Sequence, residues 1–479
     1  MDATIYPLRH ISDKVARSPI GTTPCDYNGC HPTASDIWRI FVGEHKNETF
    51  EENHVSHLAR LLLVSALAAA PAAAFATNLL NLTGYGAESS ALGGADAPLS
   101  RDPFALNLNP AGLAQIKGKA FDFYVTTYDG HYNTHSDSFG AYRKPVADTY
   151  YGIYGGIGYA QRLPDTNITA GVALIVQGGG GWSYKNLNTA FGTRDELSGV
   201  FGATKVAAGA AWEATDRLNV GASIGLNYAS GEQSFFPHTS VLNTFYGLRL
   251  KDVSGYAFNA KLGAQYRFDN DVVLGVDWGS RTNIAMKGGS LRVNYTADPA
   301  IGQVVRYDDA QLRGIVFAQE LAVGVAFRPV PRLMVAVQDK WYDWSDALRT
   351  TRIVAKASRN AAAPATVSLA SGVNAVDQHV FSIGFAWDYD DKTVLRAGGN
   401  YAHRAIPDQN MSASFAAIQA GHLSLGIERV WDADWRWSAT WEMDTRQMVT
   451  YTNPKAPFGP NATETHGGNL LHVAISRRW

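Results

Sequence analysis

The stretch YAFNAKLGAQYRF, residues 256–268, alternates apolar and other side chains almost without interruption. Its apolar set runs from Tyr256 to Phe268, and its polar set includes Asn259 and Lys261. Because successive side chains of a β-strand point to opposite faces, this pattern predicts a strand with one apolar and one polar environment. A tilted strand of about ten residues is long enough to span a bilayer.

The same alternation recurs along the chain, for example at 218–228, 320–328 and 422–428. We expect fourteen strands, since bacterial outer-membrane barrels have an even number. The ninth is long enough for two strands, but fifteen would break that rule. The expected strands are 120–132, 150–161, 168–178, 199–212, 217–229, 255–268, 271–284, 318–328, 332–355, 379–388, 392–403, 421–430, 434–446 and 469–479.

The composition excludes two classes of protein. Lys+Arg 41 against Asp+Glu 43 gives a formal net charge of −2, whereas nucleic-acid binders carry a basic excess, so we expect no nucleic-acid partner. The hydrophobic fraction is 46% but the mean hydropathy is −0.15, so apolar residues are dispersed, unlike those of a polytopic helical membrane protein. Only 18% of residues are charged, and aromatic residues are abundant. The chain is therefore predicted to be an all-β transmembrane antiparallel β-barrel.

The connections between the expected strands alternate in length. Tight turns are expected at 162–167, 213–216, 269–270, 329–331, 389–391 and 431–433, and long loops at 230–254, 285–317 and 356–378. Short periplasmic turns and long extracellular loops are typical of outer-membrane barrels, whereas a soluble sandwich or propeller has no reason to show this rhythm. We therefore expect the outer membrane of a Gram-negative bacterium.

Aromatic residues gather beside the short turns, where rings with a polar edge form a girdle at the membrane interface. They are Trp212, Phe268, Phe327, Trp387, Trp431, Trp435, Trp437 and Trp479. The last expected strand ends on Trp479 and resembles the C-terminal assembly signal of outer-membrane barrels. This resemblance implies the barrel assembly machinery as a partner, and the apolar faces of the strands imply outer-membrane lipid as another.

The N-terminal residues 1–76 are interpreted as lying outside the mature barrel. The run LLLVSALAAAPAAAFA at 61–76 follows Arg60 and ends on Ala-Phe-Ala, which predicts a secretory signal peptide at 55–76. A transmembrane anchor is the alternative, but the run is short and broken by Pro71. Residues 1–54 are expected to be a non-native extension or an unusual leader. Cys25 and Cys30 lie there, and a lone C-x4-C pair lacks two ligands of a zinc site.

Two later segments do not fit a spanning strand. Residues 77–118 are rich in small residues and are expected to form a hatch in the lumen, ahead of the barrel at 119–479. The run Gly178-Gly179-Gly180-Gly181 ends the third expected strand, and four glycines weaken or bend a strand. One interpretation is a kink that opens the barrel wall, and the other is the start of a flexible extracellular loop.

No constellation of catalytic residues stands out, so we expect no enzyme activity, no cofactor and no metal site. The glycines at 84–86 and 93–94 lack the strand–turn–helix context of a phosphate loop, and a hydrolase motif centred on Ser is missing. The 13 His show no metal-ligand spacing. Asp388, Asp390 and Asp391 fall in an expected tight turn, where Asp is favoured without calcium.

The segment GYGAESSALGGADAPLSRDPFALNLNPAGL, residues 84–113, resembles the N-terminal hatch of the FadL/TodX-type transporters of hydrophobic compounds. Asn109-Pro110-Ala111 matches the hatch motif of that family, and 344–345 and 406–410 match further positions. The resemblance implies a fourteen-stranded barrel plugged by the hatch. It also implies passive uptake of fatty acids or aromatic hydrocarbons, with lateral release through a gap at the third strand, at Gly178–Gly181.

The expected ligand is a hydrophobic small molecule, which prefers an apolar pocket and a side exit into the bilayer over a water-filled pore. A folded-back N-terminus would place Leu79 and Leu80 against this ligand. The basic carboxylate-binding residues of the family have no position-by-position match, and Arg349 and Arg352 are our substitutes. If neither faces the lumen, an uncharged substrate is favoured. A general porin for polar solutes and a non-transporting structural or adhesin barrel are the alternatives.

Overall fold

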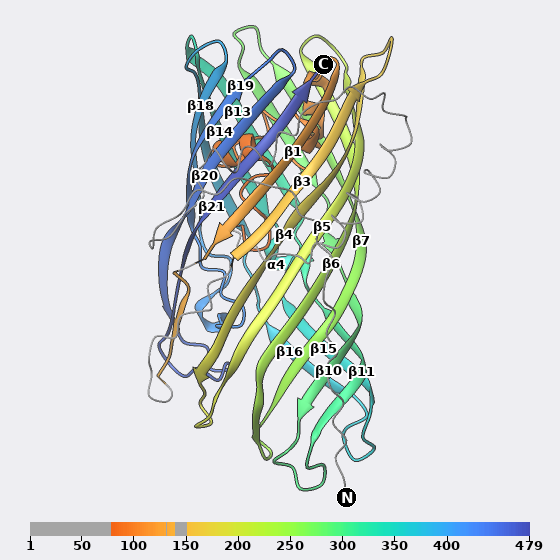
Figure 1. Ribbon diagram of the computed structural model, residues 1–479, viewed down its shortest axis with the longest axis vertical. Helices are drawn as coiled ribbons and strands as arrows, with labels where there is room; N and C mark the ends of the chain where they lie inside the picture. The colour runs from red at the N-terminus through yellow and green to blue at the C-terminus, as the bar shows by residue number, and fades with distance from the viewer. Residues whose placement is uncertain (1–77, 131, 139–150) are drawn as a thin grey trace, which may run out of the picture. The chain divides into compact units, whose positions relative to one another are not determined.

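The computed structural model describes residues 78–130, 132–138 and 151–479, so the predictions for 1–54 and 55–76 lie outside the described residues. In the described part, fourteen antiparallel strands close into a barrel in which β1 pairs with both β3 and β21 (Figure 1). The predicted fold class is confirmed. The barrel strands are β1 (Lys119–Asp129), β3 (Tyr151–Arg162), β4 (Ile168–Asn188), β5 (Arg194–Glu213), β6 (Leu218–Val241), β7 (Phe245–Arg267), β8 (Val273–Gly279), β13 (Glu320–Val330), β14 (Leu333–Tyr342), β17 (Gln378–Asp388), β18 (Thr393–Ala402), β19 (Gly421–Val430), β20 (Trp435–Tyr451) and β21 (Ala462–Arg478).

The two faces of the strands differ as the alternation predicts. In β7 the side chains of Tyr256, Phe258 and Leu262 are more than half exposed, whereas Lys261 is 2% exposed and Gln265 is also buried. The apolar set therefore faces outward to lipid and the polar set faces the lumen. None of the helices in the described residues has the length and apolar character needed to cross a membrane.

The short turns follow the prediction, and five of the eight aromatic residues expected in the girdle are exposed beside them. Each of the six predicted turns lies between consecutive barrel strands, for example the turn between β3 and β4. Trp212, Phe268, Trp387, Trp431 and Trp479 are exposed beside these turns, while Phe327, Trp435 and Trp437 are half-buried. Rings at this end of the wall are therefore available to the membrane interface.

The prediction of long loops is wrong in part, because strands continue through them. β6 and β7 remain paired as far as Val241 and Phe245. Four further strands extend the sheet from β7, at the end away from the C-terminus in Figure 1. They are β10 (Met286–Asn294), β11 (Val304–Arg313), β15 (Thr350–Ser358) and β16 (Val367–Gly372). Their inward side chains, such as Leu291 and Tyr307, are fully buried. These strands are thus held by an apolar core of their own, which a loop prediction from connection length cannot foresee.

The ninth predicted strand, 332–355, is interrupted. β14 ends at Tyr342, the short helix α4 (Trp344–Ala347) follows, and β15 resumes at Thr350. The side chain of Asp343 caps α4 by accepting a hydrogen bond from the amide of Asp346 (3.3 Å). The other short elements are β2 (Thr134–Ser136), β9 (Thr282–Asn283), β12 (Val316–Phe317), α3 (Ala87–Ala91) and the 3₁₀ helices η1 (Pro103–Leu106), η2 (Pro110–Gln115) and η3 (Asp408–Asn410).

Candidate functional site

Residues 78–116 are almost entirely buried and hydrogen-bonded to the inner face of the barrel strands. Asn109 is the N-cap of η2: its side-chain oxygen accepts from the amide of Ala111 (3.1 Å), and Pro110 fills the first helical position. The side-chain nitrogen of Asn109 donates to the carbonyl of Ala97 (2.8 Å) and to that of Ala264 in β7 (3.1 Å). The Asn109-Pro110-Ala111 motif is therefore a helix start that is tied to the wall.

Two inward-facing glycines make this close approach possible. A Cβ on Gly263 would lie 1.9 Å from Oδ1 of Asn109, and a Cβ on Gly221 would lie 2.4 Å from the carbonyl carbon of Pro110. Any larger residue at either position would push the motif away from β6 and β7.

A buried charged cluster fastens the same segment to strands β5, β7, β8 and β13. Lys261 is 2% exposed, and its Nζ lies 3.1 Å from Asp277 and 2.6 Å from Glu320. It also donates to the carbonyl of Asn107 (2.8 Å), whose side chain accepts from Lys205 (2.5 Å). Buried charges are tolerated when paired and hydrogen-bonded, so this arrangement fixes Asn107 in place.

A second ionic contact is made by helix α3. Glu88 contacts Arg101 (2.5 Å) and Arg396 of β18 (3.1 Å), and Arg396 in turn contacts Glu428 of β19 (3.2 Å). Burial alone would raise the pKa of Glu88, but the two guanidinium groups outweigh burial and hold that pKa well below its usual range. Glu88 is therefore tied to the wall through Arg396.

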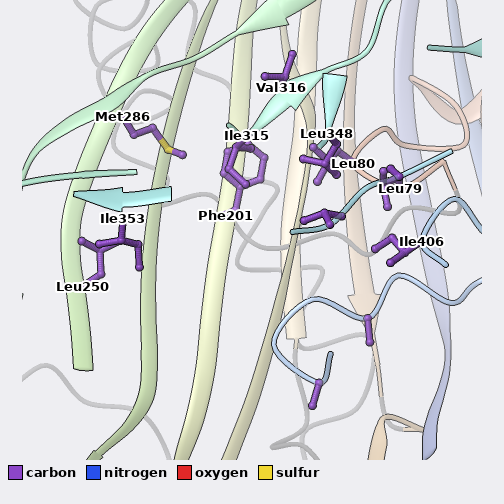
Figure 2. Packing of buried hydrophobic residues seen from close by; sticks show 14 of the residues in the cluster. Leu79, Leu80, Phe201, Leu250, Met286, Ile315, Val316, Leu348, Ile353 and Ile406 are labelled. Atoms are coloured by element: carbon purple, nitrogen blue, oxygen red, sulfur yellow. The ribbon is translucent and has the colours of Figure 1, made fainter. Parts of the chain in front are cut away.

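An apolar cluster lies next to this segment. Leu79 and Leu80 are 4% and 2% exposed, and Figure 2 shows them close to Leu348 and Ile406. The cluster also includes Phe201, Tyr184, Ile315 and Trp344. Leu79 takes a backbone φ of 64°, which is unusual for a residue with a side chain and shows that packing holds it there. Trp344 and Ile406 come from the two further stretches that carried the sequence resemblance.

The four glycines do not begin a loop, because β4 continues to Asn188 and remains paired with β5 from Gly178 to Gly181. Pairing of β4 with β3, in contrast, runs only as far as Ile175. A register shift between Val176 and Gly178 marks the point where the strand changes course. Among the described residues, β4 therefore still pairs with β5 at the glycines but no longer pairs with β3.

The N-terminal segment takes the place that β3 leaves. Asn81 forms an antiparallel bridge with Gly178, and the amide of Gly179 donates to the carbonyl of Leu80 (3.1 Å). Gly178 and Gly179 have φ of 153° and 154°, and a Cβ on Gly178 would lie 1.9 Å from the oxygen of Leu80. Glycine at 178 is thus required for the contact.

Arg349 and Arg352 are not brought to the apolar cluster. Both side chains are exposed, and Nε of Arg349 donates to the carbonyl of Ser345 (2.9 Å). On β15 the neighbour Ile353 is buried in the cluster instead. The alternation of β15 therefore directs Arg352 outward.

A model of the family described as outer membrane protein transport protein (OMPP1/FadL/TodX) matches residues 62–445. The chain belongs to this family. The resemblance inferred from the hatch motif is thereby confirmed, and the protein is an outer-membrane β-barrel of a family of transport channels for hydrophobic compounds. A search of curated protein sequences gives no significant match.

Solved structures of several channels share the fold. The toluene transporter TodX of Pseudomonas putida is 21% identical with a TM-score of 0.68, covering 83% of this chain and 99% of that one. The toluene transporter TbuX of Ralstonia pickettii is 18% identical with a TM-score of 0.65 and the same coverage. A FadL homologue of Pseudomonas aeruginosa is 12% identical with a TM-score of 0.68, again with that coverage. At these identities the similarity establishes the fold.

This member of the family has contacts that sequence reasoning missed. The hydroxyl of Tyr85 donates to the carbonyl of Gln177 (2.7 Å), and Nε2 of Gln177 donates to Oδ1 of Asn81 (3.2 Å). Gln177 precedes the glycines and Tyr85 lies in the hatch motif, but their separation in sequence gave no sign that they meet. The alternation at 256–268 predicted that Lys261 lies on the polar face, but it did not predict which residues Lys261 contacts.

One surface hollow of about 460 Å³ reaches the edge of the apolar cluster. It is lined by Val376, Tyr401, Arg404 and Ile406, among others, and Ile406 also belongs to the cluster. A larger hollow of about 650 Å³ lies beside Trp479 and the turn between β3 and β4, and contains no residue of the cluster.

Proposed function

We propose that this protein is a passive channel for the uptake of hydrophobic compounds, with capture in the apolar cluster, gating by the hatch at 77–118 and lateral release at Gly178–Gly181. The observation that carries the proposal is the bond between Leu80 and Gly179. It joins the cluster, the hatch and the weakened edge of the wall at one point. Displacement of Leu80 by a ligand would therefore also free the edge of β4.

Capture rests on the apolar surroundings of Leu79 and Leu80. A hydrophobic ligand that replaced these two side chains would exchange water for contacts with Phe201, Leu348 and Ile406. Because Arg349 and Arg352 are exposed, the cluster has no guanidinium from either of them to pair with a carboxylate. We therefore favour an uncharged substrate, such as a monoaromatic hydrocarbon, over a fatty acid.

Lateral release depends on which groups pair with the backbone amides at the edge of β4. Backbone amides left without partners are costly in lipid unless they line a cavity or find a substitute partner. Leu80 and Asn81 are that partner here. Their departure would leave an opening between β3 and β4 through which an apolar compound would pass into outer-membrane lipid. We assign recognition by the barrel assembly machinery to β21 and Trp479.

Uptake assays test the proposal. Cells that lack their own hydrophobic-compound channels would express the protein and receive radiolabelled toluene or oleate. We expect uptake of toluene to exceed that of oleate relative to empty cells, and deletion of 77–118 to raise small-ion conductance in planar bilayers. High conductance of the intact protein to polar solutes would indicate a general porin. Absence of uptake by a well-assembled barrel would favour the structural or adhesin alternative.

A further inference from the structure

Three buried side chains on two neighbouring strands converge at the inner face of the wall. His422 lies on β19, and Glu442 and Asp444 lie on β20, with His422 directly opposite Asp444 in the register. Each is 2% exposed. Nδ1 of His422 lies 2.6 Å from Oε1 of Glu442 and 2.8 Å from Oδ1 of Asp444. One ligand atom from each residue falls within 4.8 Å of the others.

The contacts within this cluster do not satisfy its polar atoms. Within the described residues, Nε2 of His422 and Oδ2 of Asp444 are buried without a hydrogen-bond partner, and Nδ1 of His422 is shared between Oε1 of Glu442 and Oδ1 of Asp444. The short distances to Nδ1 therefore bring two carboxylate oxygens to one nitrogen without a well-directed N–H···O bond. Buried polar atoms in native proteins nearly always have a partner, which here points to an absent ligand.

The remaining neighbours orient the cluster. Nε2 of His472 lies 3.0 Å from Oε2 of Glu442, the oxygen that does not face His422. Nδ1 of His472 lies 2.8 Å from Oγ1 of Thr126 on β1. A carboxylate held by a second residue through its other oxygen is the usual arrangement around a metal ligand.

We propose that His422, Glu442 and Asp444 form a binding site for one divalent first-row transition-metal ion, such as Zn²⁺. Two carboxylates and neutral imidazoles carry a charge of −2, which one divalent cation balances. A mixture of one imidazole nitrogen and two carboxylate oxygens suits such a metal and leaves a fourth position open. Mg²⁺ and Ca²⁺ prefer oxygen ligands alone, so they are expected to bind poorly.

The site lies in the wall behind the hatch. Two positions along β19 from His422, Ser424 donates to the carbonyl of Ala91 in α3 (3.1 Å). Two positions along β20 from Glu442, Thr440 donates to the carbonyl of Ala87 (2.8 Å). A bound ion would therefore stabilise the two strands on which α3 rests.

Metal binding to the intact protein tests the proposal without any assay of transport. Tag-free, full-length protein in detergent would be treated with chelator, dialysed against Zn²⁺, Ca²⁺ or Mg²⁺, and analysed by mass spectrometry of the elements. We expect one Zn²⁺ per chain, an increase in the unfolding temperature with Zn²⁺, and little retained Ca²⁺ or Mg²⁺. Loading with Co²⁺ is expected to give the strong visible absorption of a four-coordinate site.

Variants locate the ion. Asp444→Asn and His422→Gln should each reduce the affinity for Zn²⁺ at least tenfold and remove the Co²⁺ absorption. His379→Gln is the matched control, because His379 is half exposed and lies 2.9 Å from the single carboxylate of Asp339. Equal Zn²⁺ binding by Asp444→Asn and the unaltered protein would overturn the proposal. So would the absence of Zn²⁺ and Co²⁺ binding in the unaltered protein, a result that does not depend on any variant folding correctly.

Discussion

The amide of Gly179 donates a hydrogen bond of 3.1 Å to the carbonyl oxygen of Leu80. These residues lie about one hundred positions apart, yet their contact closes the edge of β4 at the level where β3 no longer pairs with it. A wall strand in a membrane cannot leave such an amide unpaired without cost. Together with the Asn81–Gly178 bridge, this bond links the state of the N-terminal segment to the state of the wall.

Gly178→Ala is expected to separate the N-terminal segment from β4. The added Cβ would lie 1.9 Å from the oxygen of Leu80, and φ at 178 is 153°. Because pairing with β5 does not depend on this contact, the barrel should still assemble, while small-ion conductance rises. Gly192→Ala is the control: φ there is 73°, but no atom of the described residues beyond its chain neighbours lies within 4 Å of the added Cβ, so conductance should stay unchanged. Equal conductance in both variants would show that the segment is held by other contacts.

Leu80→Asp is expected to weaken binding of toluene and to loosen the N-terminal segment. Leu80 is 2% exposed, and an ionised carboxylate buried without a partner is strongly unfavourable. Leu80→Met keeps the volume and apolar character, so it should cost less than about 1.5 kcal/mol and leave binding close to that of the unaltered protein. Titration with toluene in detergent, followed by calorimetry, measures both affinities. Equal affinities for the two variants would place the ligand away from Leu80.

Lys261→Met is expected to destabilise the hatch and the barrel together. The change leaves Asp277 and Glu320 without their shared cation in a buried position, which typically costs about 3–5 kcal/mol. Arg328→Met is the control, since the Arg328–Asp388 pair is largely exposed and contributes about 0–1 kcal/mol. The temperature at which the folded band is lost in gel-shift electrophoresis reports both effects. A similar temperature for the two variants would mean that the buried network is neutral.

The stability of the short strand β2 is expected to depend on pH through the protonation of His135. Nδ1 of His135 lies 2.5 Å from Oε1 of Glu464, and Nε2 lies 3.0 Å from Oδ2 of Asp137. Burial alone lowers the pKa of His135, but the two carboxylates outweigh it and raise the pKa from 6.5 to about 9. Because the folded value is the higher one, this stabilisation is complete below pH 6.5 and is lost as the pH rises through about 9.

Nuclear magnetic resonance of ¹³C-labelled histidine measures that pKa directly. Amide hydrogen exchange in β2 should become faster above neutral pH in the unaltered protein. In His135→Gln this pH dependence should vanish, because the titrating group is absent. Titration of His135 near 6.5 would contradict the prediction and show that Glu464 is not its partner in solution.

The sequence by itself determined the number of barrel strands, their inward and outward faces and the short turns. Each of these is a local property: a strand between lipid and a polar lumen must alternate, as 256–268 does, and a turn of a few residues allows few sequences. The sequence also predicted a ligand contact for Leu79 and Leu80 and a kink in the wall at the four glycines, although it did not place these residues together.

Only the tertiary structure decided which side chains meet. Leu80 reaches Gly179, Lys261 reaches Asn107, and His422 faces Asp444 because strand register and barrel closure bring distant segments together. Likewise, exposure of Arg349 and Arg352 depends on the break at α4 and on how β15 resumes after it. Alternation restrains a residue to one face of its strand, but its neighbour across the lumen depends on the path of the whole chain, which no local pattern encodes.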